Sequence, residues 1–338
     1  MHAFFLISSL ISLFFSIYSS FIPKVTQNDN LYTIKGEAQG TTYLIKYIYH
    51  DSIVSKPDID EVFLSIDSSL SLYKDYSTIS LFNASVKGIK YTSHFYNVVQ
   101  KSIEFYNLSS GTFDITCKPL SSLWGFGKNI TVPPSSLEIA STLKIVGSNK
   151  IYFSHDSLIK RVPAVQLDCD GIAQGYTVDV IYSLLVNKGI ANFMVEVGGE
   201  IRSSGCNQKT EPWVIGIETL NNSVKNDYFV DKVVSISNKA ITTSGNYRKF
   251  KKLGSKYFSH IIDPKIGRPV NNGIISVSVI ADDAVTADAL DNALMVMGIV
   301  KSFKFIQRYH NIGFNITYVN KDGFIADTSN NIFKQYLQ

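Results

Sequence analysis

The sequence predicts an α+β fold, and three observations support this prediction. Of the 338 residues, 45% are hydrophobic and only 18% are charged, which suits a large buried core and excludes disorder as the main state. Stretches with helical periodicity and stretches with strand alternation both occur. They follow one another without a regular strand–helix–strand period, so we do not expect a doubly wound parallel sheet. Residues 31–338 are expected to form one domain.

The first half of the chain begins with strands and continues with helices. Residues 31–49 alternate well enough between apolar and polar side chains to predict two strands joined by a tight turn. Residues 57–72 place apolar side chains on one face of a helix, and Pro57 suits its first turn. Residues 93–107 show the same periodicity, with Gly111 just beyond the end of this second helix.

The second half contains both kinds of element in irregular order. Residues 172–187 predict a helix that ends before Gly189, and residues 285–297 predict a last helix that stops at Gly298. Apolar runs predict strands at 193–197, 201–204, 213–218, 233–237 and 274–280. Polar, turn-forming runs predict loops at 129–136 and 221–227.

The amino terminus differs from the rest of the chain. Residues 3–22 carry no charged side chain, and Lys24 is the first one. Such a stretch is typical of the apolar part of a signal peptide or of a membrane anchor. We therefore interpret residues 1–22 as a signal peptide or amino-terminal anchor and expect an exported protein. No cysteine follows the stretch, which argues against a lipoprotein anchor.

Charge and cysteine content argue against several classes of protein. The net charge is only +4, and the basic residues form no run, so a nucleic-acid-binding surface is not indicated. The three cysteines, Cys117, Cys169 and Cys206, are too few for a disulfide scaffold. They also lack the close spacing of a zinc site, and we interpret them as small buried hydrophobic residues.

Several turns carry residue types that suit a phosphate-containing ligand. Residues 168–179 place Asp and Gly residues at the start of a predicted helix, which we expect Asp170 or Gly171 to open, and main-chain N–H groups there can hold an anion. The small hydroxyls Thr243 and Ser244 stand beside a glycine, which also suits phosphate oxygens. Residues 110–127 combine an acidic turn with aromatic and glycine residues that can form a wall for a flat ring. His260 precedes a constrained Asp-Pro turn.

The last predicted helix carries candidate metal ligands. Asp288 and Asn292 are four residues apart and therefore lie on one helix face. Both offer the oxygen ligands that Mg²⁺ prefers. In isolation, a plain polar stripe on an amphipathic helix is the better explanation of the pair. Beside phosphate-binding turns, the pair favours a Mg²⁺-dependent reaction on a phosphate or pyrophosphate.

Taken in order, these segments resemble the ApbE family of FAD:protein FMN transferases. The similarity extends from about residue 31 to the end of the chain, and eight blocks in one order make it specific. The matching blocks are GTTY at 40–43, LSLY at 70–73 with 77–83, and then 111–127, 168–179, 197–202, 243–247, 259–269 and 287–298. The resemblance implies an ApbE-like, T-fold-like architecture of two lobes built from mixed sheet and helices.

The resemblance also implies an activity. Family members face the periplasm, bind FAD and Mg²⁺, cleave the FAD pyrophosphate and join FMN to a threonine hydroxyl of a target protein, releasing AMP. We therefore expect this protein in the periplasm or on the periplasmic face of the inner membrane, acting on an exported or membrane redox protein. Mg²⁺ would offset charge on the pyrophosphate and the leaving group.

Site residues follow from the matching positions. The metal ligands would be the carbonyl of Gly171 with the side chains of Asp288 and Asn292, and His260 would lie near the phosphates. Asp288 and His260 are the candidate catalytic residues, and either an Asp or a His takes the threonine proton. FAD contacts are implied for Gln39, Tyr73, Thr112, Phe113, Asp114, Asp168, Gln174 and Ile262, in addition to Thr243 and Ser244 from the phosphate-binding turn.

Three positions depart from the family pattern. Asn292 stands where Thr is usual, Gln39 where Met is common, and Gln174 where a charged side chain is common. An amide oxygen can still bind a cation, so activity is expected. Two other functions remain open at this point: a Mg²⁺-dependent pyrophosphatase that splits FAD into FMN and AMP with water, and a protein that binds FAD without chemistry.

Overall fold

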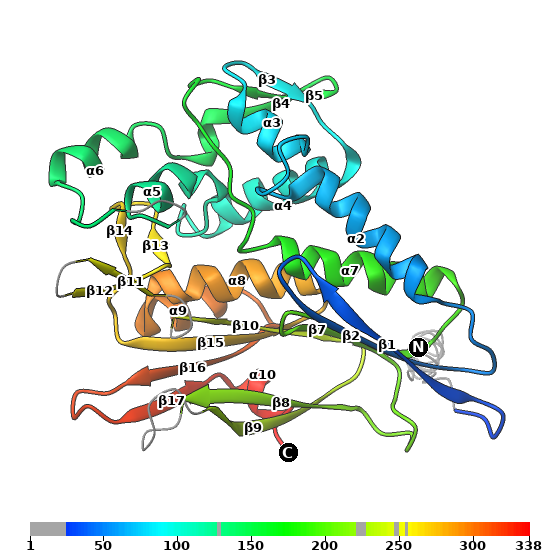
Figure 1. Cartoon of the computed structure of the whole chain (residues 1–338). Coiled ribbons are helices and arrows are strands. Elements are labelled where there is room, and N and C mark those ends of the chain that lie inside the picture. Colours follow the sequence, from blue (N-terminus) through cyan, green and yellow to red (C-terminus); the bar gives the residue numbers. More distant parts are fainter. Residues whose placement is uncertain (1–24, 127–129, 221–227, 247–249, 254–255) are drawn as a thin grey trace, which may run out of the picture.

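The centre of the protein is an eight-stranded sheet. A computed structural model describes residues 25–126, 130–220, 228–246, 250–253 and 256–338 (Figure 1). Every neighbouring pair of strands in the sheet is antiparallel. In spatial order the strands are β1 (Asn30–Ala38), β2 (Thr41–Tyr49), β6 (Asn192–Val197), β7 (Glu200–Ser204), β10 (Ala240–Gly245), β15 (Ile274–Ala281), β16 (Gly313–Val319) and β17 (Ile325–Ser329).

Both faces of this sheet are covered. Helices α7 (Ala173–Asn187) and α8 (Ala284–Met297) lie on one face, and the hairpin of β8 (Trp213–Leu220) and β9 (Tyr228–Ile236) lies on the other (Figure 1). All eight residues of β15 are buried as a result. The valines of this strand belong to the core on the helix side, whereas Ser276 and Ser278 alternate with them and are buried as well.

A layer of helices lies above α7 and α8 (Figure 1). Its main members are α2 (Lys56–Leu70), α3 (Thr78–Ala84), α4 (Ser93–Leu108), α5 (Lys118–Leu123) and α6 (Ser136–Leu143). Short strands accompany them: β3 (Gly88–Lys90), β4 (Ile151–Ser154), β5 (Ser157–Lys160), β11 (Phe250–Leu253), β12 (Lys256–Ser259), β13 (Ile262–Asp263) and β14 (Arg268–Pro269). Helices α9 (Ile299–Ile306) and α10 (Asn331–Lys334) complete the chain.

One apolar cluster joins the two layers. It runs from Phe82 on α3 and Phe95 on α4, through Leu290 on α8, to Val279 and Phe314 on the sheet. Helix α8 is therefore buried on nearly all sides, and its many alanines let both layers approach it closely. The element that carries the predicted metal ligands is thus among the most enclosed in the protein.

The predicted α+β class and the predicted long elements are confirmed. The two strands at 31–49, the helices at 57–72, 93–107, 172–187 and 285–297 and the five later strands all occur, within a few residues of the expected bounds. Helix α7 begins at Ala173, so the expectation that Asp170 or Gly171 opens it is wrong. Those two residues form a turn instead.

The elements that the sequence analysis missed are mostly short or lie within polar runs. Helix α6 starts inside the predicted 129–136 loop, where Ser135 and Glu138 form a reciprocal capping box. Strands β10 and β17 were missed because Thr, Ser and Asp make up much of their length, whereas β16 was missed although Phe314, Ile316 and Tyr318 alternate along it. The predicted loop at 221–227 and the apolar stretch at 1–22 lie outside the described residues. Within the described ranges, no helix combines the length and apolar character needed to cross a bilayer.

The buried amine of Lys160 gives the helical layer a testable pH dependence. Its Nζ donates to the carbonyl of Ser85 at 2.7 Å and lies 4.6 Å from the centre of the Phe82 ring. Burial lowers the pKa of Lys160 from 10.5 to about 8. Between pH 8 and pH 10.5, Lys160 is therefore protonated to a greater extent in the unfolded chain than in the folded protein. Its contribution to the free energy of unfolding consequently rises with pH over this range.

We expect Lys160→Met to flatten this rise. Urea unfolding at pH 8 and pH 10 should show a smaller gain in stability, or a larger loss, for Lys160→Met than for the wild type. Lys87→Met, which changes an exposed lysine of the same layer, is the control and should keep the wild-type pH dependence. Identical pH dependence in wild type and Lys160→Met would refute the role assigned to burial.

Candidate active site

The candidate site is built where α7 and α8 cross. Gly175 in the first turn of α7 lies against α8 so closely that a Cβ there would stand 2.4 Å from the carbonyl oxygen of Ala284 and 2.8 Å from Cβ of Asp288. Real Cβ atoms do not make such contacts, so only glycine permits this crossing. The contact brings the Asp170–Gly171 turn next to the middle of α8.

Asp288 joins the two helices through its carboxylate. Its Oδ2 accepts a hydrogen bond from the main-chain N–H of Gly175 at 2.9 Å, and Asp288 is only 3% exposed. Burial, together with the nearby Asp170, raises the pKa of Asp288 to about 7, although the hydrogen bond from Gly175 lowers it. A charged Asp288 is therefore costly here unless a cation accompanies it.

Asn292 lies among the predicted metal ligands, but with its nitrogen toward them. Its Nδ2 is 3.3 Å from the carbonyl oxygen of Gly171 and 3.2 Å from Oδ1 of Asp288. It also lies 3.0 Å from Oδ1 of Asp291. We expected the amide oxygen to point this way. The amide instead bridges the oxygens, and half a turn of the nearly symmetric amide group would present its oxygen to them.

Two further buried carboxyl groups adjoin Asp288, and the sequence analysis missed both. Asp291 accepts a hydrogen bond from the hydroxyl of Thr242 on β10 at 2.6 Å. Glu200 at the start of β7 is buried, and its Oε2 has no hydrogen-bond partner. Burial and their mutual proximity, with Asp288, raise the pKa values of Asp291 and Glu200 well above the usual range. The site thus concentrates acidic groups in the interior, where burial disfavours their charged forms.

These carboxyl groups do not by themselves form a metal site. In the described part of the chain, no three His, Cys, Asp or Glu side chains are grouped so that they could hold a metal ion. The predicted set differs, because it combines one carboxylate, one amide and one main-chain carbonyl. Those three groups do come together, at the distances given above.

A second group of predicted residues lies at the β1–β2 turn. Gln39 and Gly40 both have positive φ, 52° and 74°, which gives the tight two-residue turn that strand twist favours. The side-chain amide of Gln39 contacts the Thr177 hydroxyl of α7: Nε2 lies 3.1 Å from Oγ1, and Oε1 lies 3.2 Å from it. Gln174 lies against Gly198 of the β6–β7 turn, where a Cβ would be 2.3 Å from Nε2. Gln39 and Gln174 therefore border the start of α7.

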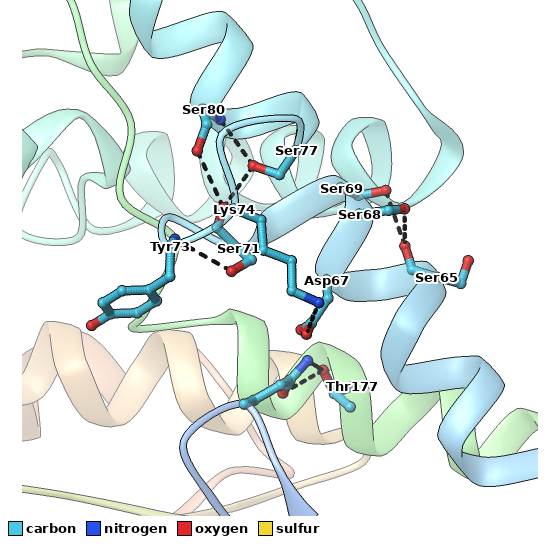
Figure 2. A network of polar contacts seen from close by, with 11 residues as sticks. Ser65, Asp67, Ser68, Ser69, Ser71, Tyr73, Lys74, Ser77, Ser80 and Thr177 are labelled. Carbon is cyan, nitrogen blue, oxygen red and sulfur yellow. Dashed lines mark hydrogen bonds and ion pairs between the residues drawn. The ribbon is translucent and has the colours of Figure 1, made fainter. Parts of the chain in front are cut away.

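Tyr73 is presented by the loop between α2 and α3. Its side chain extends away from the loop and is 92% exposed (Figure 2). The loop is held by short hydrogen bonds: the Ser77 hydroxyl donates to the Ser71 carbonyl at 2.6 Å, and Tyr73 N–H donates to Ser71 Oγ at 3.3 Å. Lys74 pairs with Asp67 of α2 at 2.9 Å (Figure 2). An exposed ring on a fixed loop is a ready platform for a flat ligand.

A cavity of about 260 Å³ lies in the helical layer. Its walls include Gly111 and Asp114 from one predicted ligand-binding segment and Pro264 and Lys265 from the segment that follows His260. Leu143, Val146 and Gly147 contribute as well, together with Tyr106 and Ser110. Two segments that are about 150 residues apart in the sequence thus face one space, as the shared ligand prediction requires.

Within the first of these segments, the three predicted FAD contacts are placed differently. Asp114 lines the cavity, and its Oδ1 accepts hydrogen bonds from Ser148 Oγ at 2.7 Å and from Thr116 N at 2.9 Å. Thr112 is half-buried and donates to a carbonyl in its own turn. Phe113 is a core residue whose ring packs against Phe105, with centroids 6.2 Å apart. Phe113 therefore supports the cavity wall from behind.

Asp168, His260 and Ile262 connect these parts. The N–H of Asp168 donates to the carbonyl of Ile115 at 2.7 Å, so the Asp114 segment and the turn before α7 are joined. Ile262 is buried in a small apolar cluster with Trp124. The ring of His260 stands edge-on to Phe126, with centroids 6.5 Å apart.

Thr243 does not reach the site. Alternation along β10 points Thr242 and Ser244 toward α8 and Thr243 toward the opposite face, where its hydroxyl lies 2.8 Å from Ser278 Oγ. Neighbouring side chains of a strand point to opposite faces, so the structure does not bring Thr243 together with Asp288 and Asp291. Ser244 faces α8 and bonds to Asp291.

The fold and these adjoining polar groups define an α+β protein with an oxygen-lined ligand site against the inner helix of a sheet-and-helix sandwich. The model of the ApbE family matches residues 39–315, and the chain belongs to that family.

Relatives of known name and a solved structure agree with this membership. FAD:protein FMN transferase of Vibrio cholerae is 36% identical over 273 residues, which cover 78% of this chain and 81% of that protein. The protein of the same name from Haemophilus influenzae is 30% identical over 96% of both chains. The solved structure of flavin transferase ApbE from Vibrio cholerae gives a TM-score of 0.81 at 32% identity, covering 91% of this chain and all of that one.

Gly175 provides a direct test of the helix crossing. We expect Gly175→Ala to push α7 from α8 and to destabilise the protein by about 1–3 kcal/mol, the usual cost of overpacking. Thermal unfolding measures the effect. Ser183→Ala on the exposed face of the same helix is the control and should stay within about 0.5 kcal/mol of wild type. Equal stability of both variants would mean that the crossing is loose.

Proposed function

We propose that this protein is a Mg²⁺-dependent FAD:protein FMN transferase that attaches FMN to a threonine of an acceptor protein by a phosphoester bond and releases AMP. The observation that carries the proposal is the meeting of the Gly171 carbonyl, Asp288 and Asn292 at the α7–α8 crossing, in a chain whose named relatives are FAD:protein FMN transferases over most of their length.

The residues present fit a magnesium ion. Mg²⁺ takes oxygen ligands and usually keeps several waters, so one carboxylate, one carbonyl and one amide suffice from the protein. The pKa of Asp288, raised to about 7 by burial, shows that its charge lacks compensation in the protein alone. A bound Mg²⁺ would supply that compensation and would neutralise pyrophosphate oxygens.

The remaining site residues suit the two ends of FAD. Tyr73 offers an exposed ring for the flat flavin, and Gln39 and Gln174 border the same end of α7. Asp114 lines the cavity in the helical layer, and Lys265, which also lines it, would provide a positive charge for phosphate oxygens. Ser244 on the α8 side of β10 is a further hydroxyl beside the acidic group.

The reaction balances without a further reactant. The threonine oxygen of the acceptor attacks the phosphorus on the FMN side of the pyrophosphate, a new P–O bond forms, and the P–O bond to AMP breaks. The threonine proton passes to a base of the protein, for which His260 and an Asp of the site are the candidates. AMP leaves with the bridging oxygen. If water takes the place of threonine, the same steps give FMN and AMP, so the site must favour the acceptor over water.

We also propose that the protein works in the periplasm or on the periplasmic face of the inner membrane. The uncharged stretch at residues 3–22 supports export or anchoring at the amino terminus. An exported or membrane redox protein is then the acceptor class that the enzyme would meet.

Incubation with FAD, Mg²⁺ and an acceptor protein that a related flavin transferase modifies tests the proposal. Mass spectrometry should show one FMN added to the acceptor and AMP in solution. FMN and AMP formed at an equal rate without acceptor would instead identify a pyrophosphatase. FAD binding with neither product would identify a flavin-binding protein.

Asp288 is the first residue to test. We expect Asp288→Ala to abolish FMN transfer and Asp288→Asn to reduce it by at least about 100-fold, because both remove the anionic ligand. Asp288→Asn keeps the volume and an acceptor for Gly175 N–H, so it should remain folded. Transfer at a normal rate by Asp288→Ala in the presence of a chelator would exclude this metal assignment.

Asn292 tests the departure from the family pattern. We expect Asn292→Thr to retain transfer, because a hydroxyl oxygen replaces a neutral amide oxygen. Asn292→Leu, similar in size but without polar atoms, should raise the half-saturating Mg²⁺ concentration about 10-fold or more. Titration of Mg²⁺ against FMN transfer compares the three forms. Equal half-saturation for Leu and Asn would make residue 292 an ordinary helix-face residue.

A further inference from the structure

Helix α8 is capped by a carboxylate from another helix. Asp179 of α7 accepts hydrogen bonds from the main-chain N–H groups of Ala284, at 3.0 Å to Oδ1, and of Val285, at 2.8 Å to Oδ2. The local cap Asp283 takes the N–H of Thr286 at 2.8 Å. Ala284 is fully buried, so water cannot satisfy its N–H, and Asp179 is the group that does.

The carboxylate of Asp179 is itself fixed. Nη1 of Arg202 on β7 lies 2.7 Å from Oδ1 of Asp179, and both side chains are mostly buried. The Arg202 guanidinium stacks on the ring of Tyr182, with Cζ 3.7 Å from the ring centre. A planar, stacked guanidinium holds a carboxylate in one orientation, which a flexible ammonium would not do. Sheet, α7 and α8 are thereby joined at one point.

This point lies one helical turn from the candidate metal ligands. Along α7, Asp179 follows Gly175 by four residues, and along α8, Ala284 precedes Asp288 by four residues. The contacts Asp179–Ala284 and Gly175–Asp288 therefore join the same two helices at positions one turn apart. Together, these two contacts fix both the position of α8 along α7 and its rotation relative to α7.

We propose that Asp179 is a positioning residue of the transferase site, which fixes the register of α8 on α7 so that Asp288 and Asn292 meet the Gly171 turn. The inference rests on the metal-binding role proposed above for Asp288 and Asn292. Asp179 acts through α8, because its carboxylate is occupied by Arg202 and by the helix N-terminus. Arg202 supports it by the same route.

A matched pair of variants separates positioning from plain helix capping. Asp179→Asn loses the charge and one of the two acceptors from the trans cap, whereas Asp283→Ala loses the local cap of the same helix. Both should lower Tm by a similar amount. Calorimetric Mg²⁺ binding should weaken about 10-fold or more in Asp179→Asn and by less than about 2-fold in Asp283→Ala. Hydrogen exchange at the Ala284 and Val285 amides should accelerate only in Asp179→Asn.

FMN transfer by the same proteins completes the test. Asp179→Asn should lower kcat while the KM for the acceptor protein stays unchanged, because the substitution displaces the candidate metal ligands and not the residues that bind the acceptor. Wild-type Mg²⁺ affinity in Asp179→Asn, or an equal loss in Asp283→Ala, overturns the positioning role and leaves the proposed function standing. A wild-type protein that binds no Mg²⁺ overturns both. If Asp179→Asn does not fold, Arg202→Gln takes its place, with a loss of Mg²⁺ affinity expected in the same direction.

Discussion

The structure depends on one close contact, the crossing of α7 and α8 at Gly175. A side chain at that position would overlap the main chain of α8, so the glycine sets the distance between the helices. Once that distance is fixed, the Gly175 N–H reaches Asp288 and the Gly171 carbonyl reaches Asn292. The sheet packs against α7 and α8 from one side and the helical layer packs against them from the other, so the surrounding structure keeps the two helices in contact.

This constraint explains why the site residues come from distant parts of the sequence. The turn before α7 supplies a carbonyl, α8 supplies the side chains, the β1–β2 turn supplies Gln39, and the helical layer adds the cavity beside Asp114. The strands of the sheet lie in chain order, and α7 and α8, which come between different strands in the sequence, pack together on one face of the sheet. Asp168 ties the cavity segment to the α7 turn through Ile115.

The sequence predicted what local periodicity encodes and missed what long-range pairing decides. The four-residue spacing of Asp288 and Asn292 placed them on one helix face, and they do lie together. Asp291 was overlooked because its partner Thr242 is 49 residues away on the sheet. The orientation of Thr243 away from α8 could not be predicted, because composition does not reveal which face of a strand a residue occupies. Phe113 was taken for a ligand contact, although its aromatic ring serves the core.

The buried acidic groups show how folding and ligand binding are linked in this protein. Asp288, Asp291 and Glu200 lie in a region where burial disfavours their charged forms, as their raised pKa values indicate. The folded protein without a cation must therefore hold protons there, or carry uncompensated charge at a cost in stability. The buried alanines of α8 let its neighbours pack closely against nearly all of its sides, and this packing offsets that cost. A cation bound to the folded state alone would remove the cost and stabilise the fold. The enclosed helix α8 is thus a suitable place for the candidate metal ligands. Its rigidity keeps these residues together when no ion is bound, and their burial makes the binding of a positive ion favourable.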